Sequence, residues 1–122
     1  MTVASQKARP KTDPGHYFED FTLGETLVHP TPRTITEGDI SLYTGLTGSR
    51  FAPQSAAPFA KAIGLAGQPV DNVLAFHMVF GTTVPDISLN AVANLGYAEG
   101  RFLKPLYAGA TVTATSEVIG LK

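Results

Sequence analysis

The chain has 122 residues and a formal net charge of −1, from nine Lys and Arg against ten Asp and Glu. That length suits one small domain, and a near-neutral chain without a long basic cluster lacks the electrostatic attraction that nucleic-acid binding needs. Hydrophobic residues make up 43% of the chain and charged residues only 16%, a composition too apolar for whole-chain disorder.

The chain contains no cysteine, which excludes disulfides, thiolate metal sites and a cysteine nucleophile. The basic residues near the N-terminus are not followed by an apolar run, so no signal peptide is expected. The longest apolar-rich stretch, residues 70–84, is too short and too polar to span a membrane, because Asp71, Asn72 and His77 interrupt it. We therefore expect a soluble, cytoplasmic protein that binds neither membrane nor nucleic acid.

The N-terminal part of the sequence predicts a tail followed by a short strand. Residues 1–15 are polar and lack apolar periodicity, so we expect a flexible tail, with one domain over residues 16–122. Residues 26–29 have the composition of a strand. Pro30 and Pro32 should end that strand, because proline cannot donate a hydrogen bond to a sheet.

Two short helices are expected next. Thr36 can cap a helix that runs to about residue 44, and the acidic residues after it favour the positive end of the helix dipole. Gly45 and Gly48 should break this helix. Residues 49–58 have the composition of a loop, and residues 59–63 that of a second short helix.

Residues 71–81 are the best helix candidate in the sequence. Apolar side chains would occupy nearly all sides of a helix over this range, which is typical of a buried helix. Pro85 and Asp86 then mark a turn. Residues 51–100 contain few charges, so much of this stretch should be core or an interface with another subunit or domain.

Alternating patterns predict strands over residues 94–103 and from Gly109 onward. In the second of these, Val112, Ala114 and Ser116 alternate with threonines. Three or four strands make a narrow sheet for one hydrophobic helix. We therefore expect an α+β unit, a central helix partly wrapped by an antiparallel sheet, which lacks its last strands and has an exposed edge that can pair with a partner.

Several segments together resemble the MaoC-like dehydratase branch of the hot-dog fold superfamily. They are HYFEDF at 16–21, RTITEGDI at 33–40 with TG at 47–48, ANLGY at 93–97 and RFLKP at 101–105. Residues 76–101 look most like the mesaconyl-CoA hydratases, also called β-methylmalyl-CoA dehydratases. The resemblance implies an enzyme that reversibly adds water to an enoyl-CoA diacid thioester, with two hot-dog units in one longer chain. Residues 16–120 would cover the first unit without its last strands.

Hydration of an enoyl thioester needs an acid–base pair, a donor for the thioester oxygen and a pocket that excludes bulk water. The family supplies the acid–base pair as Asp and His in a D-x-N-P-x-H loop. With Pro53 as the anchor, the matching positions are Arg50, Ala52 and Ser55, so the Asp, Asn and His are all replaced. Arginine stays protonated and cannot act as a base. We therefore expect this unit to contribute an acyl or CoA pocket rather than the catalytic base.

Five residues form the predicted substrate-binding set: Arg50, Asn72, Val73, Asn94 and Tyr97. The Asn72-Val73 pair matches the family's H-G pair, whose backbone N–H polarises the thioester carbonyl at a helix N-terminus. A plain helix cap by Asp71 and Asn72 is the favoured alternative. Arg50 could bind a carboxylate or a CoA phosphate, against the alternative of a solvated loop arginine. Asn94 can equally form a turn, and Tyr97 shares a strand face with Glu99 and Arg101.

His77 and Glu99 are the catalytic candidates, as an unusual acid–base pair. The favoured alternative for His77 is a neutral histidine in the core or at an interface. His16 and His29 are expected at the surface. The three histidines have no metal-ligand spacing, so no metal and no cofactor is expected apart from the CoA of the substrate.

Three hypotheses remain open from the sequence. The first is the non-catalytic N-terminal hot-dog unit of a mesaconyl-CoA-hydratase-like enzyme, paired with a second unit or with another copy through its sheet. The second is a non-catalytic thioester-binding or structural dimerisation module. The third is a self-sufficient hydratase that uses His77 with Glu99.

Overall fold

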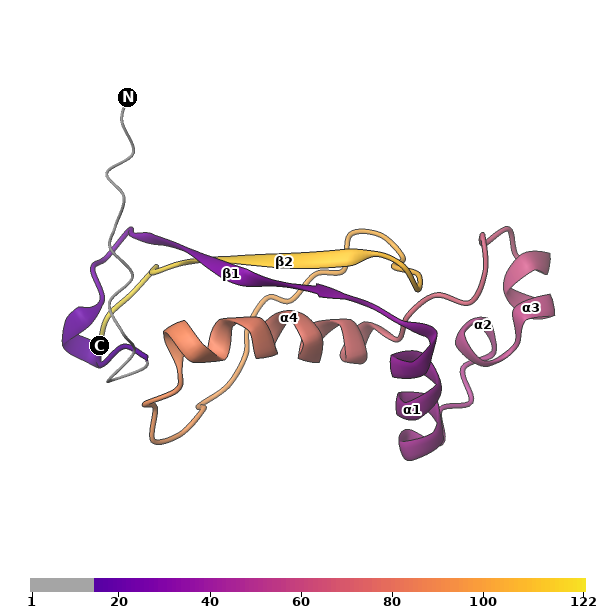
Figure 1. Ribbon diagram of the computed structural model, residues 1–122, viewed down its shortest axis with the longest axis horizontal. Coiled ribbons are helices and arrows are strands. Elements are labelled where there is room, and N and C mark those ends of the chain that lie inside the picture. Colours follow the sequence, from indigo (N-terminus) through magenta and orange to yellow (C-terminus); the bar gives the residue numbers. More distant parts are fainter. Residues whose placement is uncertain (1–14) are drawn as a thin grey trace, which may run out of the picture.

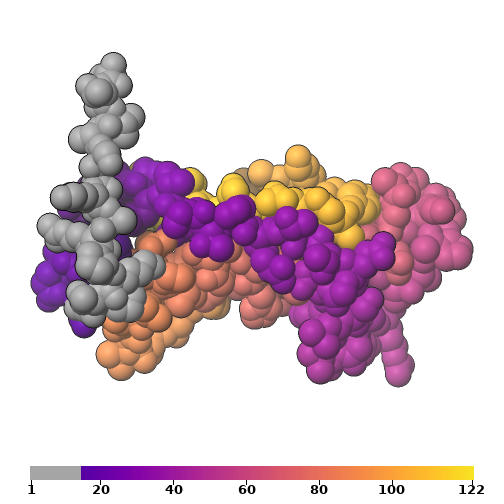
Figure 2. All heavy atoms as spheres, viewed as in Figure 1, coloured from indigo at the N-terminus to yellow at the C-terminus, as the bar shows by residue number. Residues whose placement is uncertain are grey.

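A computed structural model describes residues 15–122, and the expected N-terminal tail, apart from Gly15, lies outside this range. The elements in chain order are a 3-10 turn η1 (Phe18–Asp20), β1 (Thr26–Thr34), α1 (Glu37–Thr47), α2 (Ala52–Ser55), α3 (Ala57–Ala62), α4 (Asn72–Ile87) and β2 (Thr111–Glu117). The two strands run side by side along α4, and α1, α2 and α3 gather at one end (Figure 1). The described part is elongated, with α1 projecting from that end (Figure 2).

The sheet consists of β1 and β2, which pair antiparallel from Thr26 opposite Glu117 to Thr34 opposite Thr111. The prediction that Pro30 and Pro32 end the first strand is wrong, because β1 continues to Thr34. The pairing is irregular between His29 and Arg33, the stretch that holds both prolines. Prolines without an N–H are tolerated at such an irregularity because no ladder bond is required there.

The predicted alternation in β2 is confirmed. Val112, Ala114 and Ser116 face inward, and the residues between them are exposed. The buried core is small and centres on Ile35, Val70 and Ala75, against which Val112 and other partly buried side chains pack. One inner sheet face therefore rests on one side of α4, because a two-stranded sheet is too narrow to enclose a helix.

Thr36 caps α1 as predicted. Its hydroxyl accepts a hydrogen bond from the Asp39 N–H at 3.1 Å, and the Asp39 carboxylate accepts one from the Thr36 N–H at 2.9 Å. The helix passes through Gly45, which was expected to break it, and ends where Gly48 adopts a left-handed conformation with φ 62°. The predicted short helix near residues 59–63 corresponds to α3, and the predicted loop before it contains the single turn α2.

Asp71 caps α4, but the helix differs from its prediction in length and burial. It continues through Pro85 to Ile87, so the expected turn at Pro85 and Asp86 is wrong. The threonines of its last turns bond back to main-chain carbonyls, Thr82 to Val79 and Thr83 to Phe80, each at 2.7 Å. Ala75 is its one buried residue, because the narrow sheet covers a single side.

The predicted strand over residues 94–103 does not form. This segment has no regular secondary structure and is exposed throughout, with Gly96 at φ 154° and Glu99 at φ 53°. A positive φ at a non-glycine residue is incompatible with a regular strand. No third strand lies beside β1 or β2 among residues 15–122, so nothing in this range provides the segment with a ladder to join.

Candidate functional site

The two catalytic candidates, His77 and Glu99, are not brought together. His77 is exposed on α4 and lines a hollow of about 330 Å³ with Thr31 and Arg33. His77 is therefore not a core histidine, and the other half of that alternative, a histidine at an interface, stays a prediction. Glu99 lies in the exposed segment after α4. Within residues 15–122 the Arg33 guanidinium pairs with Asp39 and the His29 ring contacts the Asp86 carboxylate, and neither candidate takes part in these contacts.

The start of α4 is occupied by its own cap. The Val73 N–H, a predicted donor for the thioester oxygen, donates to the Asp71 carboxylate at 2.7 Å. The favoured cap interpretation is confirmed for Asp71, whereas Asn72 is the first residue of α4 and is exposed. Arg50 is exposed in the connection between α1 and α2. No hydrogen bond or ion pair within the described residues joins Arg50 to Asn72 or Val73.

Asn94 and Tyr97 do come together, against α4. The Asn94 side-chain amide donates to the Tyr97 hydroxyl. The Tyr97 ring packs edge-to-face on Phe76 at 5.0 Å and on Phe80 at 5.5 Å between ring centroids. Such aromatic pairs stabilise a contact beyond the area they bury. We call Phe76, Phe80 and Tyr97 the aromatic wall.

Two cavities adjoin the aromatic wall, and Phe76 and Val79 line both of them. The larger, about 530 Å³, lies between α4, Phe21 and the end of β2, and its walls are mostly apolar. The smaller, about 350 Å³, carries two cations, Arg101 and Lys104, beside apolar side chains. Neither cation forms an ion pair within the described range. An apolar surface with free cations at one end suits an amphiphilic anion.

A buried polar cluster, which the sequence did not predict, joins the sheet to the end of α4. His29 is 3% exposed, so the expected surface position of this histidine is wrong. Its Nδ1 lies 2.8 Å from an Asp86 carboxylate oxygen, and its Nε2 lies 2.8 Å from the Ser116 hydroxyl. The Ser116 side chain also lines the 530 Å³ cavity. Side chains alternate between the two faces of a strand, so His29 lies on the same inward face of β1 as Leu27. This alternation is the sequence signal that could have predicted the buried position of His29.

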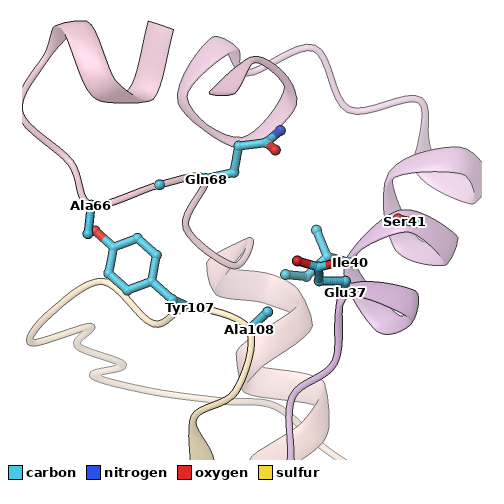
Figure 3. A pocket seen from close by; sticks show the side chains of 8 residues that line it. Glu37, Ile40, Ser41, Ala66, Gln68, Tyr107 and Ala108 are labelled. Atoms are coloured by element: carbon cyan, nitrogen blue, oxygen red, sulfur yellow. The ribbon is translucent and has the colours of Figure 1, made fainter. Parts of the chain in front are cut away.

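A further hollow of about 450 Å³ lies between α1, the segment before α4 and the loop before β2. Figure 3 shows Glu37 and Ile40 on α1, with Gln68, Tyr107 and Ala108 around the same space. The Gln68 side chain donates to the Gln54 carbonyl at 3.0 Å and so joins this segment to α2. The sequence offered no motif that distinguishes these residues.

At the start of α1, the carboxylate of Asp39 has a pKa below its ordinary value of 3.8. Hydrogen bonds from the Thr36 backbone and hydroxyl are the main causes, and the Arg33 guanidinium contributes further. Arg33 lies 2.7 Å from the Asp39 carboxylate. Across the described residues, no group of three or more potential metal ligands is present. No helix in residues 15–122 is long and apolar enough to cross a membrane.

An antiparallel sheet packed along one central helix is the framework that the sequence resemblance implied. The family model of the MaoC like domain matches residues 19–122, and the chain therefore belongs to this family. The α+β, hot-dog-like fold is confirmed by solved structures. A putative MaoC domain protein dehydratase from Chloroflexus aurantiacus superposes with a TM-score of 0.87 at 63% identity, over 92% of this chain and 32% of that one.

Two curated relatives are similar over 112 residues. A "Beta-methylmalyl-CoA dehydratase" of Chloroflexus aurantiacus is 64% identical, and a "Mesaconyl-CoA hydratase" of Cereibacter sphaeroides is 59% identical. Each match covers 92% of this chain, which spans about a third of the length of these relatives. A monoamine oxidase regulatory protein from Archaeoglobus has a TM-score of 0.72 at 28% identity, over 84% of this chain and 70% of that one.

Proposed function

We propose that the chain is a hydratase-family hot-dog unit that binds an acyl-CoA thioester of the mesaconyl-CoA or β-methylmalyl-CoA type. In this proposal it contributes the acyl and CoA pocket rather than the catalytic base of hydration, and acts in the cytoplasm. The observation that carries the proposal is the identity of 64% and 59% to proteins named for these substrates. Because the chain spans about a third of those relatives, the activity of the whole protein is itself part of the proposal.

The surface along α4 supports the binding part of the proposal. The aromatic wall and the 530 Å³ cavity offer apolar surface for an acyl group and pantetheine arm. Arg101 and Lys104, on the adjoining cavity, offer positive charge for carboxylate or phosphate groups. A mesaconyl-type acyl group ends in a carboxylate, and CoA carries phosphates, so this ligand combines the same two features.

The replacement of the family's acid–base motif supports the pocket role. The family's acid–base positions correspond to Arg50, Ala52 and Ser55, none of which matches the Asp, Asn and His of the motif. The His29 imidazole has no exposed side-chain surface, and both its ring nitrogens have partners. While Ser116 is unmodified, its hydroxyl occupies the Nε2, so the imidazole does not deprotonate a water molecule in the cavity directly.

The sheet supports association with a second unit or another copy. Within residues 15–122 each strand pairs along one edge only, which leaves the other edges able to accept a further strand. Val92, Leu95 and Leu103 are more than nine-tenths exposed, and the last two lie in the segment that was expected to be a strand. Burial of these side chains against a partner removes apolar surface from water. Analytical ultracentrifugation should therefore detect a dimer, and a monomer at all concentrations would contradict association between copies.

The decisive experiment combines thermal shift with a hydration assay. Mesaconyl-CoA should raise the Tm of the chain, and free CoA should raise it less, because only the thioester fills the apolar cavity. Hydration by this chain should be undetectable and should appear only when the remaining two thirds of a curated relative are supplied. Full hydration activity of the chain alone would overturn the pocket role, and no Tm response to any CoA ester would overturn binding.

A further inference from the structure

The cluster of Ser116, His29 and Asp86 has no role in the pocket function proposed above. Its members come from three elements: β2, β1 and α4. Asp86 is separated from His29 by 57 residues, and His29 from Ser116 by 87, so the fold alone brings them together. A buried histidine between a carboxylate and a serine is the pattern that activates serine nucleophiles, and it is recognised by geometry rather than by sequence order.

The hydrogen bonds fix the tautomer of a neutral His29 imidazole. An ionised Asp86 carboxylate can only accept, so the Nδ1 of His29 donates to it at 2.8 Å. In the neutral ring the Nε2 is then an acceptor, and the Ser116 hydroxyl, at 2.8 Å, donates its proton to it. Asp86 is held in turn through its backbone carbonyl, which lies 2.6 Å from the Nδ1 of His16. The ring is therefore oriented to remove a proton from Ser116.

Ser116 is the one member of this cluster that lines the 530 Å³ cavity. Phe76, Phe80 and Ile87 provide apolar walls around it. Ile119 and Gly120 line the same cavity, just after the last ladder bond, which the Val118 N–H donates to the Glu25 carbonyl. Within the described range no acceptor is bonded to the N–H groups of these two residues, so they are free to stabilise an oxyanion.

We propose that Ser116 is a nucleophile that accepts an acyl group from an ester or thioester bound in this cavity. The Ser116 Oγ attacks the carbonyl carbon, and its proton passes to the His29 Nε2. The bond to the leaving sulfur or oxygen then breaks, and His29 returns the proton to the leaving group. A water molecule attacks the acyl-serine with the same proton transfers, so that thioester and water become carboxylic acid and thiol.

The choice of a thioester as the natural acyl donor rests on the proposed function, but the nucleophilicity of Ser116 does not. A fluorophosphonate probe tests it without any CoA ester, because the serine oxygen displaces fluoride and forms a stable bond to phosphorus. Intact mass spectrometry of the whole chain counts the labels, and peptide mapping locates them. Hydrolysis of p-nitrophenyl butyrate provides a second, catalytic readout.

One label per chain, located on Ser116, is the expected result. Ser116→Ala should lose both the label and p-nitrophenol release, whereas Thr115→Ala, which changes the exposed neighbour on the opposite strand face, should retain both. Asp86→Asn should slow labelling at least tenfold, since a neutral amide no longer stabilises the imidazolium that forms when His29 takes the proton. A label on another residue, no label, or equal p-nitrophenol release by wild type and Ser116→Ala would overturn the proposal. Because peptide mapping uses the wild-type chain, this test does not depend on the variants folding, and its failure would leave the mesaconyl-CoA binding test unaffected.

Discussion

The Nδ1 of His29 on β1 lies 2.8 Å from a carboxylate oxygen of Asp86 in the last turn of α4. The His29 side chain is fully buried, and the Asp86 side chain is 28% exposed. This contact connects β1 to the last turn of α4, just after Pro85. It therefore holds the two layers of the fold together at a point away from the apolar core around Ile35.

Removal of the Asp86 carboxylate should destabilise the fold. Asp86→Ala leaves a buried imidazole N–H without an acceptor, at a cost of about 1–3 kcal/mol in the free energy of unfolding. Asp86→Asn should cost less, because its amide oxygen can still accept that hydrogen bond. Urea denaturation followed by circular dichroism measures both. Glu99→Gln is the matched control, because it changes an acidic residue in an exposed segment and should alter stability little. Equal effects of Asp86→Ala and Glu99→Gln would contradict a structural role for the His29–Asp86 pair.

Loss of the α1 cap should be measurable on its own. Thr36→Ala removes the hydroxyl that accepts from the Asp39 N–H, and such caps contribute about 1 kcal/mol. Ser41→Ala, inside the same helix, should leave stability unchanged or slightly raised, since alanine has the higher helix propensity. The comparison is made by urea denaturation, and a Thr36→Ala variant as stable as wild type would contradict the capping role.

The Asp39 carboxylate should make stability depend on acid pH. Its pKa in the folded chain is below 3.8, mainly because of the Thr36 hydrogen bonds, so the ionised form stabilises the fold above the ordinary value. That contribution is lost as the pH falls through the lowered pKa. Wild type should therefore be more stable than Asp39→Asn at neutral pH, and the difference should shrink below about pH 4. Tm measured against pH tests this, and a difference that grows on acidification contradicts it.

The sequence predicted the elements whose determinants are local. The Thr36 and Asp71 caps, α3 and the alternation of β2 follow from side chains and spacing within a few residues. The predictions that failed depended on distant partners. Pro30 and Pro32 sit within β1 because the pairing with β2 is irregular there, and residues 94–103 stay irregular because no strand pairs with them in the described range.

In the candidate site, too, sequence motifs and local pattern predicted some features, while contacts between distant residues were missed. The family resemblance identified the class of protein, and Asn94 and Tyr97 do meet against α4. His77 was a candidate because it lies on an apolar helix, yet the narrow sheet leaves it exposed. The cluster around His29 could not be found from local pattern alone, because its partners lie 57 and 87 residues away.

Tyr97 should matter for ligand binding through its ring. Tyr97→Ala removes the edge-to-face contacts with Phe76 and Phe80, so the aromatic wall loses its outer member and the Kd for mesaconyl-CoA should rise about tenfold. Tyr97→Phe retains the ring and loses only the hydroxyl that Asn94 contacts, so its Kd should stay near the wild-type value. Fluorescence titration measures the two constants. A similar loss in both variants would assign the effect to the hydrogen bond instead.

The two cations of the smaller cavity should control the salt dependence of binding. Arg101→Gln and Lys104→Gln each remove a charge beside the apolar groove, and each should weaken mesaconyl-CoA binding several-fold at low salt. The loss should diminish as salt is added, because screening already weakens the wild-type attraction. Lys61→Gln, an exposed cation on α3, is the control and should bind like wild type. Equal effects of all three substitutions would indicate a general charge effect rather than a site.

Isothermal titration calorimetry with mesaconyl-CoA tests the central claim most directly, because a single titration reports both binding and turnover. A unit that provides the pocket without the hydration base should give saturable heats for one site per chain, with no hydrated product in the cell. Absence of saturable heat would contradict the assignment of a thioester pocket. A sustained heat of reaction after each injection, with hydrated product in the cell, would contradict the claim that this chain lacks the base.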